Sequence, residues 1–160
     1  MNKTLTVEAR GDREIVMTRD FDAPRRMVFD AWTRPELLRR WLGVRRGWEL
    51  AVCEVDLRPG GGYRFVWRGP DRKDMGVSGV YREVVAPELL VNTEVFDDPW
   101  YPGESVITTG FDERAGRTTV TTVMRYQTPG ARDGILAGPF KSGVAESYDR
   151  LESMLVEPGR

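Results

Sequence analysis

The chain has 160 residues, of which 31% are charged and 40% hydrophobic, and its formal net charge is −1. This length fits a single domain over residues 1–160, with a core over about 13–156, and the charge gives no reason to expect nucleic acid or an anionic membrane as a partner. Histidine is absent and Cys53 is the only cysteine, which excludes Ser-His-Asp and Cys-His catalysis, an intramolecular disulfide and a conventional zinc site. With no signal peptide and no long apolar run, a cytoplasmic protein is expected.

The N-terminal part of the chain predicts one strand followed by two short helices. Apolar and polar residues alternate over 13–22, as in a strand with one buried face. The segment 22–33 is expected to be helical, with Asp22 as its N-cap. A second helix is expected over 35–42, with Thr33 as a possible cap.

The middle of the chain alternates with a period near two, and the tail has a helical period. The predicted strands are 48–57, 62–68, 75–85, 89–96, 104–111 and 118–127. Their short, Gly-, Pro- and Asp-rich links favour an antiparallel meander. Apolar residues recur every three or four positions over 131–156, which predicts a long amphipathic helix interrupted near Gly138 and Pro139. The fold class is therefore α+β.

Three consecutive glycines, Gly60, Gly61 and Gly62, raise the question of a phosphate-binding loop. Such a loop lies between a strand and the start of a helix, but the residues that follow here, YRFVW, alternate like a strand. No Lys-Ser/Thr pair completes the motif. We therefore predict a hairpin turn, with positive φ at Gly60 and Gly61 and with Gly62 opening the next strand.

Four blocks, in this order, resemble one known superfamily: FDAPRRMVFDAWTRPELLRRWLG, CEVDLRPGGGYRF, GVYREVVAPELLV and GVAESYDRLESML. They are similar to the START-like, birch-pollen-allergen-like superfamily (SRPBCC, polyketide-cyclase-like), in the branch of the heat-shock chaperone ATPase activator homologues. The resemblance implies a helix-grip fold, in which a seven-stranded antiparallel sheet curls around the C-terminal helix and leaves a cavity for apolar or aromatic molecules. Some members of the superfamily are cyclases or hydrolases, whereas others only bind or carry ligands.

Two departures from the family pattern matter for function. The chaperone activator has an additional N-terminal domain, whereas this chain begins near its first predicted strand, so a co-chaperone role is not expected from the family name. Many relatives carry Trp after the glycine of the last helix, where this chain has Val144. The smaller side chain leaves more room at that point. The branch has no shared catalytic motif that can be transferred by position.

Aromatic residues are the first candidate constellation. Tyr63, Phe65 and Trp67 alternate along one strand and so share one of its faces. They form either the wall of a ligand pocket or part of an ordinary core. The full set of candidate ligand-binding residues is Trp41, Tyr63, Phe65, Trp67, Phe96, Phe111, Met124, Tyr126, Phe140 and Tyr148. No metal or cofactor is expected.

Carboxylates and tyrosines are the candidates for acid–base chemistry. Glu54 and Asp56 share one strand face, which is either the cavity wall or a solvated outer face paired with Arg64 or Arg68. The weak catalytic candidates are Glu54, Asp56, Glu94 and Tyr126, with Arg64 or Arg125 to stabilise an anion.

Basic residues gather around the second helix at Arg39, Arg40, Arg45 and Arg46. They attract an anionic partner or, more simply, form a solvated face. Cys53 alternates with Glu54 and so faces the opposite side, where it is expected to act as a small buried hydrophobic residue.

The loop 97–103, DDPWYPG, places Trp100 and Tyr101 between two prolines. These aromatics form a lid over the cavity mouth, a contact in a homodimer, or a small cluster packed on the end of the sheet.

Three functions follow as hypotheses. The leading one is a small-molecule binding protein with an internal cavity for an apolar or aromatic ligand. The second is a cyclase-, dehydratase- or hydrolase-type enzyme that uses a cavity carboxylate or tyrosine. The third is a protein-interaction module, either co-chaperone-like or dimeric.

Overall fold

The strands and helices follow the order that the sequence predicts, with one additional strand at the start. The computed structural model describes residues 3–44, 47–71, 73–99 and 101–156. The elements in these residues are β1 (Thr6–Arg10), β2 (Glu14–Phe21), α1 (Arg25–Thr33), α2 (Pro35–Trp41), β3 (Glu49–Val55), β4 (Gly62–Arg68), β5 (Asp74–Val85), β6 (Leu89–Phe96), β7 (Ser105–Arg114), β8 (Arg117–Arg125), α3 (Pro129–Ala137) and α4 (Phe140–Val156).

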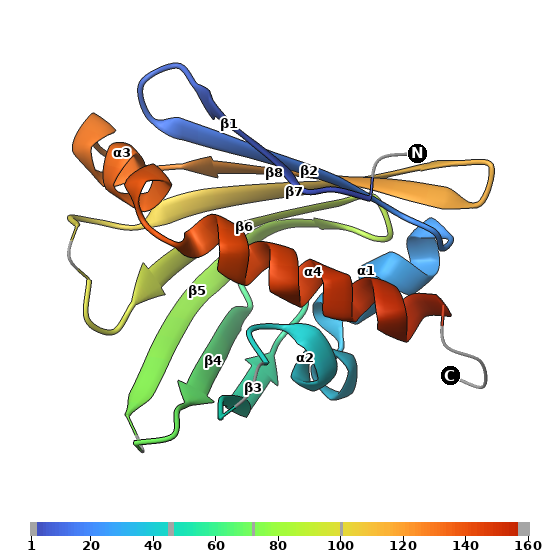
Figure 1. The fold of residues 1–160 in the computed structure, drawn as a ribbon, viewed down its shortest axis with the longest axis horizontal. Helices are drawn as coiled ribbons and strands as arrows, with labels where there is room; N and C mark the ends of the chain where they lie inside the picture. Colours follow the sequence, from blue (N-terminus) through green and yellow to red (C-terminus); the bar gives the residue numbers. More distant parts are fainter. Residues whose placement is uncertain (1–2, 45–46, 72, 100, 157–160) are drawn as a thin grey trace.

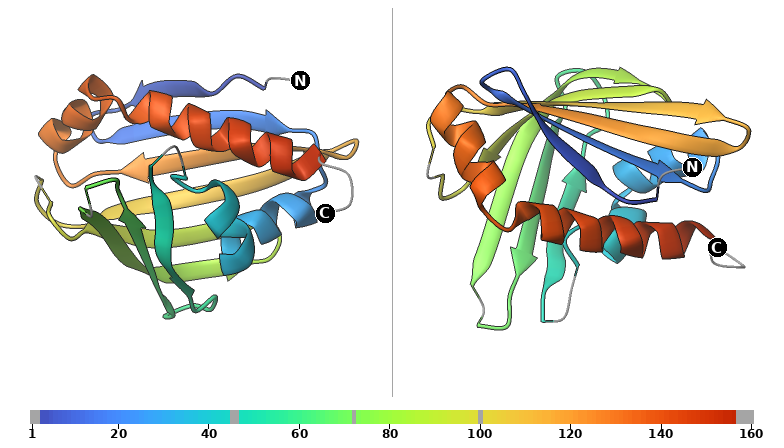
Figure 2. Two further views of the ribbon diagram at one scale, coloured as in Figure 1. Left: turned by 60° about the horizontal axis from the view of Figure 1, so that its bottom comes forward. Right: turned by 45° about the horizontal axis from the view of Figure 1, so that its top comes forward.

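The strands form a single antiparallel sheet in the order β1-β2-β8-β7-β6-β5-β4-β3. The sheet bends around α4, which lies along its concave face, while α1 and α2 connect β2 to β3 (Figures 1 and 2). The α+β class and the helix-grip arrangement are therefore confirmed. We use "concave face" below for the side of the sheet that is turned toward α4.

The sheet has eight strands rather than seven, because β1 pairs with β2 at the edge. Four of the five residues of β1 are exposed, and only Val7 is partly buried. A strand held mainly by backbone pairing needs no alternation of apolar residues, so its sequence carries little signal.

The predicted caps of the first two helices are wrong. The N-cap of α1 is Pro24 without a side-chain hydrogen bond, and Glu113 of β7 instead accepts a 2.7 Å hydrogen bond from the backbone N–H of Arg25. Thr33 does not cap α2, because its hydroxyl donates to the carbonyl of Phe29 at 2.9 Å. A tertiary contact thus replaces the local cap of α1, as the free N–H groups of a helix start allow.

The C-terminal helical segment is divided as expected. Thr128 caps α3 by accepting a hydrogen bond from the N–H of Ala131, and α3 ends at Gly138. Pro139 lies between the helices, and α4 begins at Phe140. The break turns the chain so that α4 runs across the concave face (Figure 2).

The triple glycine forms the β3–β4 corner and not a nucleotide loop. Gly60 has φ +86° and Gly62 begins β4, as predicted. Gly61 has no positive φ, but a side chain there would collide with the backbone oxygen of Asp56. The corner also pairs with Tyr81 of β5, whose N–H donates to the carbonyl of Gly61 at 2.8 Å. The absence of side chains therefore lets three segments meet closely.

Within the described part of the chain, no helix is long and apolar enough to cross a membrane. The same residues contain no cluster of three or more Cys, Asp or Glu side chains suited to a metal ion.

Candidate functional site

Strand register decides which side chains face α4. Cys53, Phe65, Val77 and Phe96 lie side by side across β3, β4, β5 and β6 and belong to the same face. Cys53 and Val77 are buried in the core, so this is the concave face. Glu54, which alternates with Cys53, is on the convex side, as expected.

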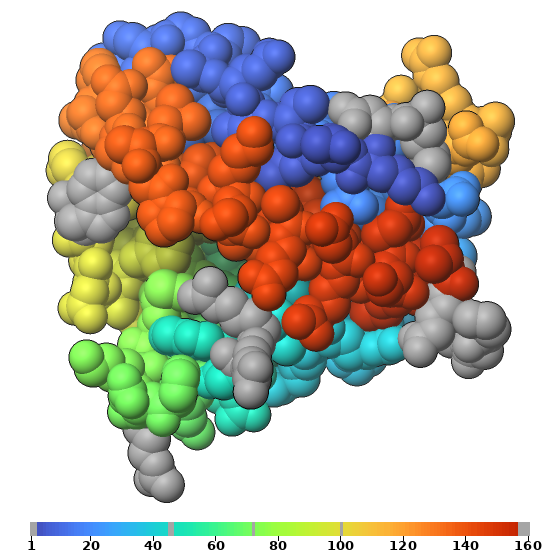
Figure 3. Space-filling model, in the orientation of Figure 1, coloured from blue at the N-terminus to red at the C-terminus, as the bar shows by residue number. Residues whose placement is uncertain are grey.

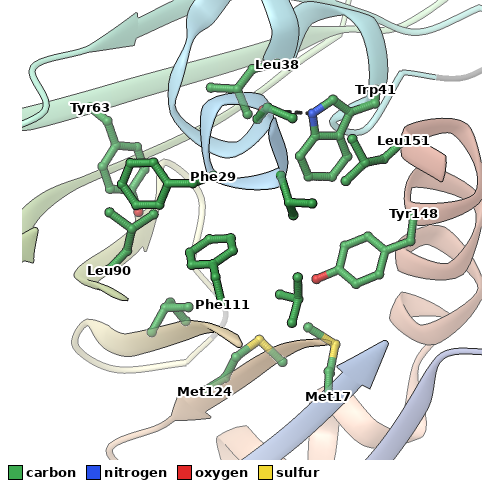
Figure 4. Close-up of a cluster of buried hydrophobic side chains, with 14 of the residues drawn as sticks. Met17, Phe29, Leu38, Trp41, Tyr63, Leu90, Phe111, Met124, Tyr148 and Leu151 are labelled. Carbon is green, nitrogen blue, oxygen red and sulfur yellow. Dashed lines mark hydrogen bonds between the residues drawn. The ribbon is translucent and has the colours of Figure 1, made fainter. Parts of the chain in front are cut away.

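One end of the interior is densely packed, and we call it the packed end. It consists of Phe21, Phe29, Trp32, Trp41, Phe111, Tyr148 and Leu151. The ring of Trp32 makes edge-on contacts with Phe21, Phe111 and Tyr148, with centroid distances of 6.1, 5.6 and 5.5 Å. Figure 4 shows Trp41, Tyr148 and Leu151 from the helices directed toward Phe111 and Met124 from the sheet.

Three of the candidate ligand-binding residues belong to this packed end. Trp41 is 0% exposed, and its indole N–H donates to the carbonyl of Ala31 at 2.9 Å. Phe111 and Tyr148 are 3% and 6% exposed, and burial raises the pKa of Tyr148 to about 12. Met124 at 9% and Trp67 at 8% are also buried. These five side chains act as core in this structure.

The other end, which we call the open end, retains accessible apolar surface. It consists of Phe65, Phe96, Ile135, Leu136, Phe140 and Val144, which pack against the core but stay partly exposed. The helix α4 packs chiefly against α2, and also against α1 and α3, which hold it across the sheet. Figure 3 shows the surface recessed between the orange start of α4 and the green to yellow β5 and β6.

Glu94 lies on the concave face beside the open end. It alternates along β6 with Asn92 and Phe96, and Phe96 pairs with the inward Val77. Its cross-strand neighbour on β7 is Ser105, and Gly79 of β5 comes level with it between the pairs Ser78–Val95 and Tyr81–Asn92. Both neighbours are small, and the ring of Tyr63 from β4 lies over Gly79.

The carboxyl group of Glu94 is deeply embedded and has no partner among the residues that the structure describes. Burial alone raises its pKa from 4.5 to about 7, although the residue keeps some accessible surface. Glu94 therefore combines a deeply embedded carboxyl group with partial accessibility of the residue as a whole. No described residue donates a hydrogen bond or forms an ion pair with this carboxyl group.

Three tyrosines lie near enough to Glu94 for its charge to affect their pKa values. Burial chiefly, and next the Glu94 carboxylate, raise the pKa of Tyr63, Tyr101 and Tyr126. The rings of Tyr101 and Tyr126 meet edge-on at 5.6 Å. The phenols therefore stay neutral, and they provide hydrogen bonds and aromatic surface but not a base.

The hydroxyl group of Tyr63 is already engaged. It donates to the carbonyl of Thr93 at 2.5 Å and accepts from the side-chain amide of Asn92 at 3.1 Å. Gly79 leaves room for this ring, since a side chain at Gly79 would collide with it. Tyr63 therefore presents its ring, not its hydroxyl group, to the interior.

The carboxylates Glu54 and Asp56 lie outside the interior. Both are exposed, and Glu54 is paired in register with Arg64 on the convex side. Asp56 accepts hydrogen bonds from Arg58 at 3.0 and 3.1 Å. Arg64 is bound by both carboxylate oxygens of Asp97, at 2.6 and 2.7 Å. Both carboxylates therefore lie on a solvated outer face, but the expected partners differ, because Arg64 binds Asp97, Arg68 binds Asp74 and Asp56 binds Arg58.

A hollow of about 340 Å³ lies beside β5, β7 and β8, and Tyr126 belongs both to its lining and to the surroundings of Glu94. It is lined by Arg13, Arg82, Glu104, Val106, Arg125, Tyr126 and Gln127. Arg82 is 3.0 Å from Glu104, and Arg125 is 3.7 Å from Glu14. Arg125 therefore belongs to a set of surface ion pairs, not to the surroundings of Glu94.

The remaining candidates have structural positions or lie outside the described residues. Arg39 donates to the carbonyl of Leu50 at 2.9 Å and ties α2 to β3. Burial raises the pKa of Cys53 to about 11, so its thiol stays protonated and unreactive. Arg45, Arg46 and Trp100 lie outside the described residues, whereas Tyr101 is only 7% exposed.

Sequence reasoning named Glu94 and Tyr126 but missed Asn92, Gly79 and Ser105. The segment LVNTEVF places Asn92 and Glu94 on one strand face with Phe96, which is an unusual set of polar residues for a face that carries aromatics. Gly79 and Ser105 become relevant only through pairing with β6.

The curved antiparallel sheet, the helix across it and the apolar interior define a helix-grip protein of the SRPBCC-like superfamily. Residues 22–156 match the family model described as "Activator of Hsp90 ATPase homolog 1-like protein", and the chain belongs to this family.

Solved structures support the same assignment. A protein from Rhodobacter sphaeroides is 29% identical, with a TM-score of 0.90 over 95% of this chain and 97% of that one. A protein from Mycobacterium smegmatis is 22% identical, with a TM-score of 0.83 over 98% and 99% of the two chains. An HSP90 activator from Plasmodium falciparum is 23% identical, with a TM-score of 0.56 over 71% and 72%. The last two likenesses concern the fold alone. No curated protein sequence matches the chain.

Proposed function

We propose that this protein binds a small apolar or aromatic molecule at the open end of its interior. The observation that carries the proposal is the contrast in burial on the concave face. Phe65, Phe96, Phe140 and Val144 keep accessible surface, whereas Phe21, Trp41 and Leu151 at the packed end are 0% exposed. Ligand sites are typically concave, mostly apolar, and equipped with a few polar groups. A cytoplasmic location is part of the proposal, and the single buried cysteine is in keeping with it.

The test is to fill the open end from α4. Val144→Trp places a large ring on the inward side of the helix, at a position where a Trp is familiar from similar sequences. A panel of neutral aromatic alcohols, with 1-naphthalenemethanol as the first probe, is titrated into ¹⁵N-labelled protein. We expect shifts at Phe65, Phe96 and Phe140, and a loss of affinity of about tenfold or more in the variant.

The matched control is Lys141→Trp, which adds the same ring to an exposed position of the same helix. It should bind the probes as the original protein does. If no member of the panel binds, or if Val144→Trp binds them all unchanged, the proposed site is wrong.

An enzymatic role is the second candidate, and Glu94 is the observation that favours it. Its pKa of about 7 lets the carboxyl group exchange a proton near neutral pH, as a general acid or base requires. Mass analysis of each bound compound after prolonged incubation distinguishes the two roles. A product formed by the original protein but not by Glu94→Gln would support catalysis.

A co-chaperone role has no such support. The family and the Plasmodium falciparum protein are both named for HSP90 activation, but the likeness to that protein is one of fold. The proposal of a homodimer through the loop 97–103 likewise has little support, because Tyr101 is packed inward against Tyr126.

A further inference from the structure

A carboxyl group, that of Glu94, lies beside the open end, and its surroundings indicate which ligands it would select. Glu94 projects from the middle of β6 on the concave face, two residues from Phe96. Its neighbours across the sheet, Gly79 and Ser105, are small, and the Glu94 residue keeps some accessible surface. A polar group in this position contributes to recognition only if the ligand has a complementary group.

Glu94 has no cationic partner in the described part of the chain. Among the described residues, no arginine or lysine side chain is within ion-pair distance of the Glu94 carboxyl group. The titratable groups that face it are the phenols of Tyr63, Tyr101 and Tyr126, which are neutral. A buried carboxylate without a counter-ion is costly, and a bound cation would remove much of that cost.

The aromatic surroundings favour the same chemistry. The ring of Tyr63 lies 5.1 Å from that of Phe65, and Tyr101 meets Tyr126 at 5.6 Å. Faces of aromatic rings attract ammonium groups, and they do so more strongly when water is excluded. Aromatic walls beside a single carboxylate are thus complementary to a protonated amine on an apolar body.

We propose that the ligand of this site is an amphiphilic amine, in which an aromatic or aliphatic body occupies the open end and a protonated nitrogen pairs with the Glu94 carboxylate. This inference rests on the proposed binding function and adds the chemical class of the ligand.

Three probes with the same ring system isolate the contribution of the head group. They are 1-naphthylmethylamine, 1-naphthalenemethanol and 1-naphthoic acid, which carry a positive, a neutral and a negative head group at about pH 8. For the original protein we expect the amine to bind about tenfold or more tightly than the alcohol, and the acid to bind most weakly.

Glu94→Gln removes the charge and keeps the shape of the side chain. It should weaken amine binding about tenfold and leave alcohol binding unchanged. Glu54→Gln makes the same chemical change on the convex side and should alter neither affinity. Equal affinity of the original protein for amine and alcohol, together with an unchanged Glu94→Gln variant, would overturn the cationic preference while leaving the binding function intact. Failure of all three probes and of the alcohol panel would instead count against the binding function itself.

Proton release on amine binding distinguishes pairing of the amine with Glu94 from a purely structural role of that residue. An amine that pairs with the carboxylate lowers the pKa of Glu94, so binding near neutral pH should release a proton. Calorimetry in two buffers of different ionisation enthalpy measures the number of protons released on binding. We expect a fractional proton release on amine binding by the original protein and by Glu54→Gln, and none by Glu94→Gln. Amine binding without proton release in the original protein would contradict the pairing.

Discussion

The two ends of the interior are built from the same kinds of residues but are used differently. At the packed end, helices α1, α2 and α4 close over the sheet, and Phe21, Trp41 and Leu151 are each 0% exposed. At the open end, Phe65 and Phe96 occupy the concave face of central strands and still keep accessible surface. Aromatic content alone therefore does not identify a ligand site, because how closely the helices approach the sheet decides which aromatics become core.

The two ends also differ in whether a buried charged residue has a partner of opposite charge. Arg19 is 3% exposed on the concave face of β2, and its guanidinium group lies 2.7 Å from Asp149 of α4 and 5.1 Å from the ring of Phe21. Glu94 has no such partner among the described residues. The charge at the packed end therefore fastens a helix, whereas the carboxyl group of Glu94 pairs with no charged group in the described part of the chain.

Truncating one phenylalanine at each end should give the largest difference. Phe21→Ala removes a ring that is 0% exposed and in contact with Trp32 and Tyr148, so we expect a loss of stability of about 3–5 kcal/mol. Phe65→Ala should cost only about 1–2 kcal/mol, because part of that ring is not covered by other atoms. Urea denaturation followed by tryptophan fluorescence measures both values. Equal losses would remove the distinction between the ends.

Neutralising the charge at the open end should stabilise the protein. Since burial raises the pKa of Glu94 from 4.5 to about 7, the folded state holds more protons than the unfolded state between these values. Stability then falls as the pH rises through this window, and the cost is fully present above it. We expect Glu94→Gln to gain about 2 kcal/mol at about pH 8, allowing for partial exposure, and almost nothing at about pH 4.

Glu54→Gln is the control, since its carboxyl group is exposed on the convex side. Its stability should follow that of the original protein at every pH. If Glu94→Gln is destabilising at about pH 8, the carboxylate has a favourable partner in the folded protein, and its availability to a ligand is refuted.

Removing the counter-ion at the packed end should destabilise the protein, whereas Glu94→Gln should stabilise it. Asp149→Asn leaves the guanidinium group of Arg19 buried without its negative partner, which we expect to cost about 1–2 kcal/mol. The cost is limited because the Asp149 side chain is 73% exposed and water can approach it. Asp74→Asn, which breaks the exposed pair with Arg68, should change stability by less than about 0.5 kcal/mol. Indistinguishable urea midpoints for the two variants would argue against a fastening role for Arg19.

Most of the fold could be predicted from the sequence, because strands and helices each space their apolar residues with a characteristic period. The spans 62–68 and 89–96 match β4 and β6 to the residue. The edge strand β1 was not predicted, because its pairing with β2 uses backbone groups and buries little side-chain surface. The contact that replaces the N-cap of α1 was not predicted, because Glu113 lies 88 residues from Arg25 in the chain.

The site was predicted less completely, for a physical reason. Alternation placed Tyr63 and Phe65 on one face, but it could not tell whether α4 would cover them. The importance of Glu94 depends on Gly79 and Ser105, which come beside it only through the register of β5 and β7. Local patterns thus determine the direction of a side chain, whereas its surroundings depend on contacts between distant segments.

The smallest change in stability is expected for Val144→Trp, which tests whether the open end has room for a ligand. Val144→Trp adds a large ring at the open end, and we expect it to change stability by less than about 0.5 kcal/mol, because Val144 is only partly buried. At the packed end, Ala31 is 0% exposed, and Ala31→Val should cost about 1 kcal/mol although it adds only two methyl groups. Thermal and urea denaturation of both variants give the comparison directly. If the bulky change at Val144 destabilises the protein more than the slight change at Ala31, the open end is as tightly filled as the packed end, and there is no room there for a ligand.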